Sequence, residues 1–313
     1  MGNPVINVVD LVKKYGNLTA LDHLSFMVAE GEILGLLGPN GSGKTTAINC
    51  ILSLLKFEKG SIEVFGRQMS PDAYDIKRDI GVVMQNVAVF NELTVYENID
   101  YFCGLYVHDK AVRKPYVEEA ITFTGLKDFR KFYPKKLSGG LLRRLNIACG
   151  IAHKPKLIIM DEPTVAVDPQ SRNNILEGIK RLNKNGATVL YTSHYMEEVE
   201  LICSRIIILD KGKIIASGTK QELKAMIELG EKIRVEGVSL DDVLMEKIKN
   251  RPGILVADYR DRALEVRFAR EGNGVLGLLN FLRDNGIEMG RLYSEMPTLN
   301  DVFLELTGKE LRD

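Results

Sequence analysis

The stretch Gly38-Pro39-Asn40-Gly41-Ser42-Gly43-Lys44-Thr45-Thr46 decides the fold of this chain. It follows the short apolar run Glu32–Leu37 and precedes Thr45–Leu55, so it joins a predicted strand to a predicted helix. Glycines let backbone N–H groups turn inward on phosphates, and a helix N-terminus adds a favourable dipole. We expect Lys44 to reach the β- and γ-phosphates of a nucleotide and the Thr45 hydroxyl to bind magnesium.

A second feature is an acidic pair at the end of an apolar run. Leu157–Met160 leads directly into Asp161 and Glu162, and ligands bind at the carboxyl ends of strands in open α/β sheets. We expect Asp161 to hold magnesium, directly or through water, and Glu162 to orient and polarise the attacking water. The alternative, an acidic pair that only caps a strand, is disfavoured by the phosphate loop in the same chain.

The first part of the chain alternates between strand-like and helix-like segments. Short apolar runs separated by helices predict an α/β fold with mostly parallel strands. Two earlier segments, Val5–Leu11 and Leu24–Val28, have the alternation of half-exposed antiparallel strands. The further expected elements are a strand at Val189–Thr192 and helices at Asn173–Asn183, Met196–Ser204, Phe90–Tyr106 and Tyr116–Thr124.

The pattern changes near residue 229, so we predict two domains, residues 1–228 and 229–313. The order strand, helix, strand, strand, helix, strand predicts a small α+β, ferredoxin-like unit, followed by a last helix at Leu299–Leu306. Its expected strands are Lys232–Val235, Ile254–Tyr259, Leu264–Phe268 and Ile287–Tyr293, and its expected helices are Leu240–Ile248 and Val275–Arg283.

Composition excludes several classes of protein. Of the 313 residues, 45% are apolar and 27% are charged, as in a globular protein. Lys plus Arg and Asp plus Glu both number 42, and this balance argues against a nucleic-acid partner. The four cysteines form no CxxC pair, which favours a reduced setting. We see no secretory signal and no apolar run near the roughly 18 residues of a membrane span.

A third motif narrows the class of nucleotide-binding protein. Leu137-Ser138-Gly139-Gly140, followed by Arg143 and Arg144, resembles the signature of the ATP-binding cassette (ABC) family. The resemblance covers about Val5 to Gly218, and the other motifs of the family follow in the expected order. They are Tyr15 as the candidate adenine-stacking ring, Gln85 after the strand Gly81–Met84, Asp168 after Glu162-Pro163-Thr164, and His194 after Val189–Thr192.

The resemblance implies a P-loop NTPase cassette that works as a head-to-tail dimer with ATP and Mg²⁺. In that arrangement Ser138-Gly139-Gly140 of one subunit contacts the γ-phosphate of the ATP held by the other, and Asp168 bridges the subunits. His194 contacts the γ-phosphate and positions Glu162. Gln85 meets the magnesium or the attacking water. The chain departs from the family pattern at Leu141, usually Gln, and at Ala166-Val167, usually Gly-Leu.

The resemblance also implies a membrane partner. Residues 86–102 look like the region that receives a helix of a separate transmembrane permease subunit, and the ending Pro297–Gly308 looks like that of drug-resistance-type export ATPases. We therefore expect a homodimer, or a heterodimer with a related ATPase, that is cytoplasmic and peripheral on the inner face of the cell membrane. The alternatives are a soluble ABC ATPase acting on ribosomes or DNA and a low-turnover nucleotide-dependent binding module.

Overall fold

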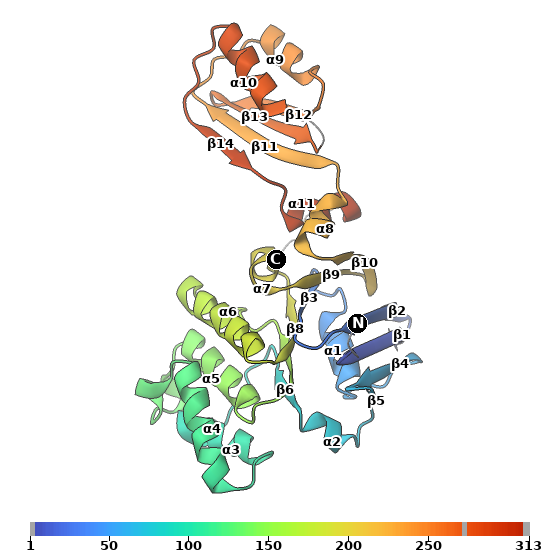
Figure 1. Cartoon of the computed structure of the whole chain (residues 1–313), viewed down its shortest axis with the longest axis vertical. Helices are drawn as coiled ribbons and strands as arrows, with labels where there is room; N and C mark the ends of the chain where they lie inside the picture. The colour runs from blue at the N-terminus through green and yellow to red at the C-terminus, as the bar shows by residue number, and fades with distance from the viewer. Residues whose placement is uncertain (1–3, 271–273, 309–313) are drawn as a thin grey trace. The chain divides into compact units, whose positions relative to one another are not determined.

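The computed structural model of the protein describes residues 4–270 and 274–308. Its contacts divide the chain into two compact units, one ending at Thr219 and the other beginning at Lys220. We name them the cassette and the C-terminal unit and describe each by itself (Figure 1). The predicted boundary at residues 228 and 229 lies inside the second unit, because helix α8, Lys220–Ala225, packs against helix α11, Leu299–Thr307.

The centre of the cassette is a six-stranded sheet with the strand order β10-β9-β3-β8-β7-β6. The five strands from β9 to β6 are parallel, as the apolar runs predict, and β10 is antiparallel to β9. All residues of β3, β7 and β8 are buried. The strands are β3 (Ile33–Leu37), β6 (Ile80–Val83), β7 (Leu157–Asp161), β8 (Thr188–Ser193), β9 (Arg205–Asp210) and β10 (Lys213–Gly218).

Parallel pairing determines where the candidate residues lie. The carboxyl ends of parallel strands meet at one edge of a sheet, where ligands bind in open α/β folds. The phosphate loop leaves this edge after β3, Gln85 follows β6, Glu162 follows β7, and His194 follows β8. Four separate segments of sequence therefore reach the same edge.

A second, antiparallel sheet with the order β2-β1-β4-β5 carries the N-terminal segment. Its strands are β1 (Ile6–Tyr15), β2 (Leu18–Val28), β4 (Lys59–Val64) and β5 (Arg67–Gln68). Strands β1 and β2 are antiparallel, as predicted, with Ile6 opposite Val28. Apolar residues of this sheet, of α1 (Lys44–Ile51) and of the central sheet share one core, so the phosphate loop is anchored on both sides.

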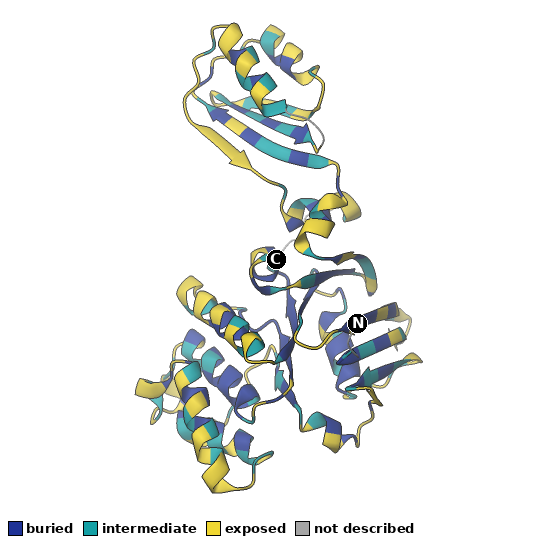
Figure 2. Cartoon of the chain, viewed as in Figure 1, coloured by how far each residue is buried: buried dark blue, intermediate teal, exposed yellow. Residues whose placement is uncertain are grey.

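Helices form the rest of the cassette. Helix α3 begins at Val95, later than the expected Phe90, because the Thr94 hydroxyl caps Glu97 N–H and the Glu97 carboxylate accepts from Thr94 N–H. The apolar faces of α3, α4 and α5 pack into a separate core, drawn dark blue in Figure 2. The helices are α2 (Tyr74–Lys77), α3 (Val95–Gly104), α4 (Lys110–Phe123), α5 (Gly139–Ile151), α6 (Pro169–Lys184) and α7 (Met196–Ile202), with 3-10 turns at Lys127–Phe129 and Pro134–Lys136.

The C-terminal unit is a four-stranded antiparallel sheet with the order β12-β13-β11-β14, the split-βαβ arrangement that the sequence predicts. Alternate residues of the sheet, such as Ile233, Leu264 and Val266, share a core with the helices. Strand β14 lies later than expected, and all its residues are exposed. The elements are β11 (Leu229–Glu236), α9 (Asp242–Lys249), β12 (Ile254–Arg260), β13 (Ala263–Ala269), α10 (Gly274–Asp284), β14 (Leu292–Glu295) and α11.

The cysteines and the helix lengths agree with the sequence analysis. Cys50, Cys103 and Cys149 are buried, Cys203 is half-buried, and all four thiols are free. Burial raises the pKa of the Cys50 thiol to about 11, as expected for a small core residue. Across residues 4–270 and 274–308, the helices fall short of the length and apolar character needed to cross a bilayer.

Candidate active site

The phosphate loop connects β3 to α1 and is shaped by close backbone contacts. Gly43 has φ 109° and caps α1, and a Cβ there would lie 2.8 Å from Ala20 O, so a glycine is required. Lys44 is only 4% exposed, and its Nζ donates to Gly38 O at 2.7 Å and Pro39 O at 3.1 Å. The ammonium therefore lies within the curve of its own loop.

Glu162 is the centre of the cluster at this edge of the sheet. It is 4% exposed, and its Oε1 lies 3.1 Å from Lys44 Nζ. Gln85 Nε2 donates to Glu162 Oε2 at 3.2 Å, and His194 Nδ1 lies 3.2 Å from the same oxygen. The structure thus brings together four of the predicted residues from four segments. The backbone of Glu162 has φ 47°, a strained conformation that the surrounding contacts must maintain.

Asp161 and Thr45 form a second contact beside this cluster. The fully buried Asp161 accepts from Thr45 Oγ1 at 2.8 Å and from Thr192 Oγ1 at 2.7 Å. Thr192 Oγ1 in turn accepts from Glu162 N–H at 3.0 Å. The start of α1 is therefore tied to the end of β7 through oxygen atoms, the ligand type that Mg²⁺ prefers.

The signature turn lies elsewhere in the cassette. Ser138 caps α5 by accepting from Leu141 N–H at 3.3 Å, and Ser138 and Gly139 are exposed. A Cβ on Gly140 would lie 2.5 Å from Ser171 Oγ and 3.1 Å from Asp168 Oδ2, so the turn packs on the start of α6. In the part of the chain that the structure describes, no hydrogen bond joins the turn to the phosphate loop.

Asp168 and the departures from the family pattern lie beside this turn. Asp168 caps α6 by accepting from Ser171 N–H at 2.9 Å, and that hydrogen bond lowers the pKa of its carboxyl. Ala166 has φ 59°, so it adopts the left-handed conformation that suits the glycine usual in the family. Leu141 is half-buried against the core of α3, α4 and α5, where its apolar side chain finds partners.

Tyr15 stands apart from the Glu162 cluster. It ends strand β1 and is 48% exposed. Lys13 Nζ lies 5.2 Å from the centre of its ring, and Lys13 also pairs with Glu58 at 3.3 Å. The Lys13 ammonium thus lies over one face of the ring, while the side chain remains accessible to a ligand.

Arg143 belongs to the site although the sequence indicated only a basic start of a helix. It is 4% exposed; its Nη1 donates to Met84 O at 3.0 Å and its Nη2 to Glu162 O at 3.1 Å. Burial lowers the pKa of its guanidinium. Arg143 and Arg144 are neighbours in the sequence, and neighbouring side chains on a helix point about 100° apart. This spacing indicates that one of the two arginines faces the interior.

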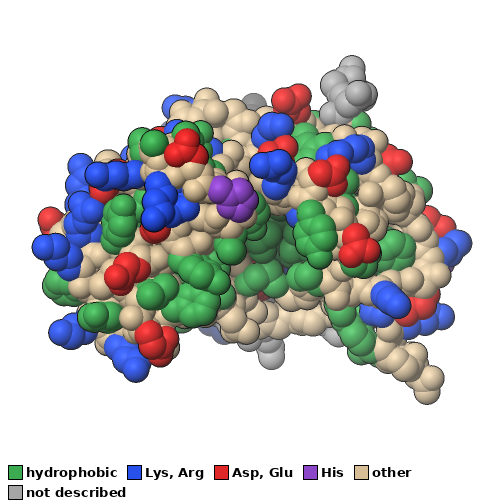
Figure 3. Space-filling model, turned by 90° about the horizontal axis from the view of Figure 1, so that it is seen from below, with side chains coloured by type: hydrophobic (Ala, Val, Ile, Leu, Met, Phe, Trp, Pro, Cys, Tyr) green, Lys and Arg blue, Asp and Glu red, His purple; other side chains and the backbone are tan. Residues whose placement is uncertain are grey.

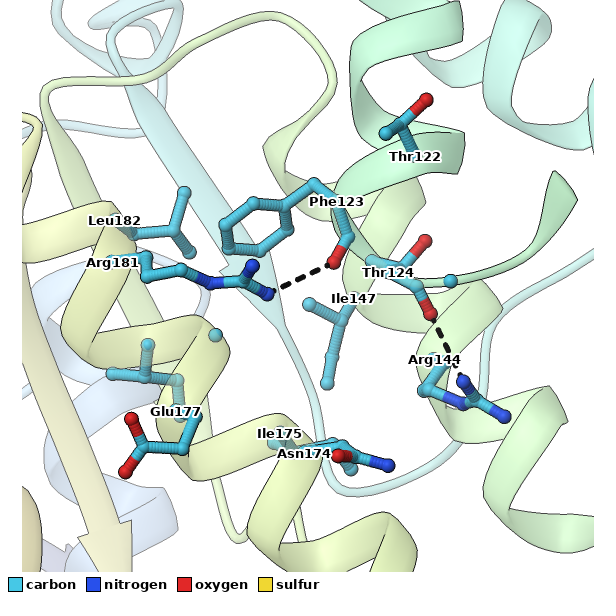
Figure 4. Close-up of a pocket in the computed structure, with 13 residues that line it drawn as sticks. Thr122, Phe123, Thr124, Arg144, Ile147, Asn174, Ile175, Glu177, Arg181 and Leu182 are labelled. Atoms are coloured by element: carbon cyan, nitrogen blue, oxygen red, sulfur yellow. Dashed lines mark hydrogen bonds between the residues drawn. The ribbon is translucent and has the colours of Figure 1, made fainter.

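A cavity of about 520 Å³ opens between α6, the end of α4 and the middle of α5 (Figure 4). Arg181 donates to Phe123 O and Arg144 donates to Thr124 O, each at 3.3 Å. The cavity contains none of the predicted site residues. Its two guanidinium groups already have carbonyl partners, so it is a gap between packed helices and not the nucleotide site.

Comparison with known families agrees with this geometry. Residues 21–165 match the ABC transporter family. Residues 218–307 match the C-terminal domain of proteins like the ATP-binding protein DrrA1-3. The second match covers nearly all of the C-terminal unit.

Known proteins resemble the chain over its whole length. Linearmycin resistance ATP-binding protein LnrL of Bacillus subtilis is 37% identical, with 99% of this chain and 100% of that protein aligned. The Nod factor export ATP-binding protein I of Ralstonia nicotianae is 33% identical, over 99% of this chain and 96% of that protein. The daunorubicin/doxorubicin resistance ATP-binding protein DrrA of Streptomyces peucetius is 33% identical, over 98% and 94%.

Solved structures resemble the cassette. The dimeric post-hydrolysis ATP-binding cassette MJ0796, bound to ADP and Pi, has a TM-score of 0.63 and 28% identity, covering 68% of this chain and 98% of that one. An ATP-binding subunit of an ABC transporter has a TM-score of 0.65 and 26% identity, covering 71% and 92%. The chain belongs to the ABC transporter family as an ATP-binding and ATP-hydrolysing subunit of the type found with drug-resistance and Nod factor export proteins.

Proposed function

We propose that two copies of this ATPase close head to tail around ATP and drive export through a separate membrane subunit. The observation that carries the proposal is the exposed turn at Ser138 and Gly139, which opens α5 without a hydrogen bond to the phosphate loop. A capped helix N-terminus is suited to an anion. Because its own phosphate loop is not its partner, we assign the turn to the γ-phosphate of ATP held by a second copy.

Magnesium fits the oxygen atoms of Thr45 and Asp161. Mg²⁺ is usually held by one or two carboxylates together with substrate phosphates. The described residues contain no group of three or more His, Cys, Asp or Glu that could hold a metal by itself, so the site requires the nucleotide. We propose Thr45, Asp161 and Gln85 as the residues that hold the ion. When bound, it neutralises charge on the β- and γ-phosphates.

Each residue of the Glu162 cluster has a proposed role. Glu162 takes up a proton from the attacking water, and Gln85 and His194, both near its Oε2, orient it. Lys44 moves from Glu162 to the phosphates when ATP enters. Asp168, at the start of α6, contacts the partner subunit. Tyr15 stacks on the adenine.

A separate permease subunit is proposed from the surface of the cassette. Phe90, Tyr101 and Leu105 are 42%, 47% and 54% exposed. Figure 3 shows hydrophobic side chains gathered around a hollow at the end of the cassette where α2 and α3 lie. We propose that this surface receives the permease at the inner face of the membrane. A hydrophobic partner chain should co-purify with the protein from solubilised membranes; isolation without one would contradict this part of the proposal.

A mixing experiment tests the shared sites. Ser138→Arg should leave ATP binding intact but block turnover, because the long side chain fills the γ-phosphate position of the partner's site. Each composite site combines the phosphate loop of one subunit with the signature turn of the other. In a dimer that pairs a Ser138→Arg subunit with a Lys44→Ala subunit, both changes therefore fall on the same composite site, and the second composite site stays intact. Hydrolysis should therefore reappear when two inactive variants are mixed. Turnover by monomers at high dilution would rule out shared sites.

Truncation tests the division into two units. A chain ending at Thr219 should fold and bind ATP, because every candidate site residue precedes that position. A chain ending at Glu228 keeps α8 but loses α11, on which α8 packs, and should be less soluble. We also propose that the C-terminal unit stabilises the dimer. The chain that ends at Thr219 should then lose ATPase activity at low protein concentration and regain it at high concentration. Failure of this chain to bind ATP would show that the two units share a core.

A further inference from the structure

Glu198 is a buried carboxylate to which the proposed reaction gives no role. It lies in α7 and is 2% exposed. Its Oε2 accepts three hydroxyl hydrogen bonds, from Tyr191 at 2.7 Å, Thr164 at 2.8 Å and Ser193 at 2.9 Å. Three donors on one oxygen orient that carboxylate closely.

Two of these donors adjoin the reacting groups, Thr164 in the loop after Glu162 and Ser193 as the last residue of strand β8. Thr164 follows Glu162 by two residues in the loop between β7 and α6. Ser193 immediately precedes His194, and its Oγ also accepts from Tyr195 N–H at 2.9 Å. A single oxygen of Glu198 therefore links the loop of Glu162 to the loop of His194.

The other oxygen faces a third element of the site. Glu198 Oε1 lies 3.3 Å from Arg172 Nε, and neither atom has a hydrogen-bond partner among the described residues. Arg172 N–H donates to Asp168 O at 2.9 Å, and its guanidinium lies 4.6 Å from the centre of the Tyr195 ring. The ion pair thus connects Glu198 to the start of α6.

A contribution to stability does not account for this arrangement. The Glu198 carboxylate is buried while Arg172 is 29% exposed. Burial of that carboxylate costs desolvation energy that an ion pair without a hydrogen bond repays poorly. The three hydrogen bonds on Glu198 Oε2 instead specify geometry, because they join fixed donors in a buried polar network. The nearby backbone of Glu162 is strained, at φ 47°, and a strained loop needs its neighbours to hold it.

We propose that Glu198 is a positioning residue for ATP hydrolysis, which holds the loop of Glu162 at a fixed spacing from the loop of His194. The inference rests on the proposed roles of Glu162 and His194. Glu198 acts through Thr164 and Ser193.

The first test is Glu198→Gln, measured by steady-state ATP hydrolysis. The amide keeps the shape but weakens the three hydrogen bonds and loses the charge facing Arg172. We expect kcat to fall at least tenfold, since misplacement of reacting groups by about 1 Å can cost on the order of 10²-fold, while KM for ATP changes little. The matched control is Glu197→Gln, an exposed neighbour on the same helix, which should leave both constants unchanged. Unchanged kcat in Glu198→Gln overturns the inference.

Three single-hydroxyl variants decide the matter even if Glu198→Gln fails to fold. Thr164→Val, Ser193→Ala and Tyr191→Phe each remove one donor from the same oxygen. Tyr191 lies inside strand β8 and adjoins neither Glu162 nor His194 in the sequence, whereas Ser193 ends the strand directly before His194. We expect the first two to lower kcat at constant KM and Tyr191→Phe to change only the unfolding temperature. The inference is overturned if all three variants keep the kcat of the unchanged protein, or if Tyr191→Phe loses as much kcat as Thr164→Val and Ser193→Ala. If these variants are normal while Glu162→Gln is inactive, the proposed function stands and only the role of Glu198 fails.

Discussion

Glu162→Gln should bind ATP and hydrolyse it roughly 10²–10⁴-fold more slowly, the usual cost of losing a well-placed general base. Glutamine keeps the length and shape of the side chain that lies between Lys44, Gln85 and His194, so the phosphate loop remains intact. Only the charge that accepts the proton from water is lost.

Phosphate release and gel filtration with ATP check this expectation. The variant should accumulate as a dimer with ATP trapped in it, because closure is followed by no hydrolysis. Glu197→Gln, an exposed glutamate changed in the same way, serves as the control and should keep full activity. Near-normal turnover in Glu162→Gln would falsify the role proposed for this residue.

Lys44→Ala should weaken ATP binding and also destabilise the protein without nucleotide. A charge-assisted hydrogen bond contributes about 1.5–3 kcal/mol, so we expect roughly a 10- to 100-fold loss of ATP affinity by calorimetry. The ammonium is also the cation 3.1 Å from the buried Glu162 carboxylate. Removing one partner of a buried pair leaves an uncompensated charge, and the free energy of unfolding should fall by about 3 kcal/mol.

The double variant Lys44→Ala with Glu162→Gln separates the two effects. Glutamine carries no charge that needs the ammonium, so the double variant should regain most of the lost stability in denaturant unfolding. Its ATP affinity should remain low, because the phosphates still lack Lys44. Unfolding curves that show no recovery would mean that the ion pair does not explain the loss.

The local parts of the site could be predicted because their structure is encoded within a few residues. The phosphate loop between an apolar run and a helix required only the sequence near Lys44. Glu162 could be placed because parallel strands align their carboxyl ends. The predicted strand Ile287–Tyr293 begins before the observed β14, because all four residues of β14 are exposed and the apolar pattern therefore gives no register. The predicted helix Phe90–Tyr106 is longer than α3, because the capping box at Thr94 starts the helix at Val95.

The contacts that support the site could not be predicted, because they join residues far apart in the chain. Arg143 reaches Glu162 O across 19 positions, and Glu198 reaches Thr164 across 34. A buried glutamate or arginine has no apolar period of its own, so sequence periodicity treats it as a surface residue. Only the folded chain shows which charged side chains are enclosed.

The ion pair between Lys44 and Glu162 has a consequence for the energetics of nucleotide exchange. An incoming triphosphate must compete with the Glu162 carboxylate, which already lies 3.1 Å from the Lys44 ammonium. ATP binding therefore replaces the ion pair between Lys44 and Glu162 with contacts between Lys44 and the phosphates, and the net free energy of ATP binding is less favourable. On the proposed roles of Lys44 and Glu162, we expect the separated subunit to hold ATP less tightly than its phosphate loop alone permits. The same competition favours departure of the spent nucleotide, since the carboxylate recaptures the lysine as the phosphates leave, and each cycle returns to an empty, internally neutralised site.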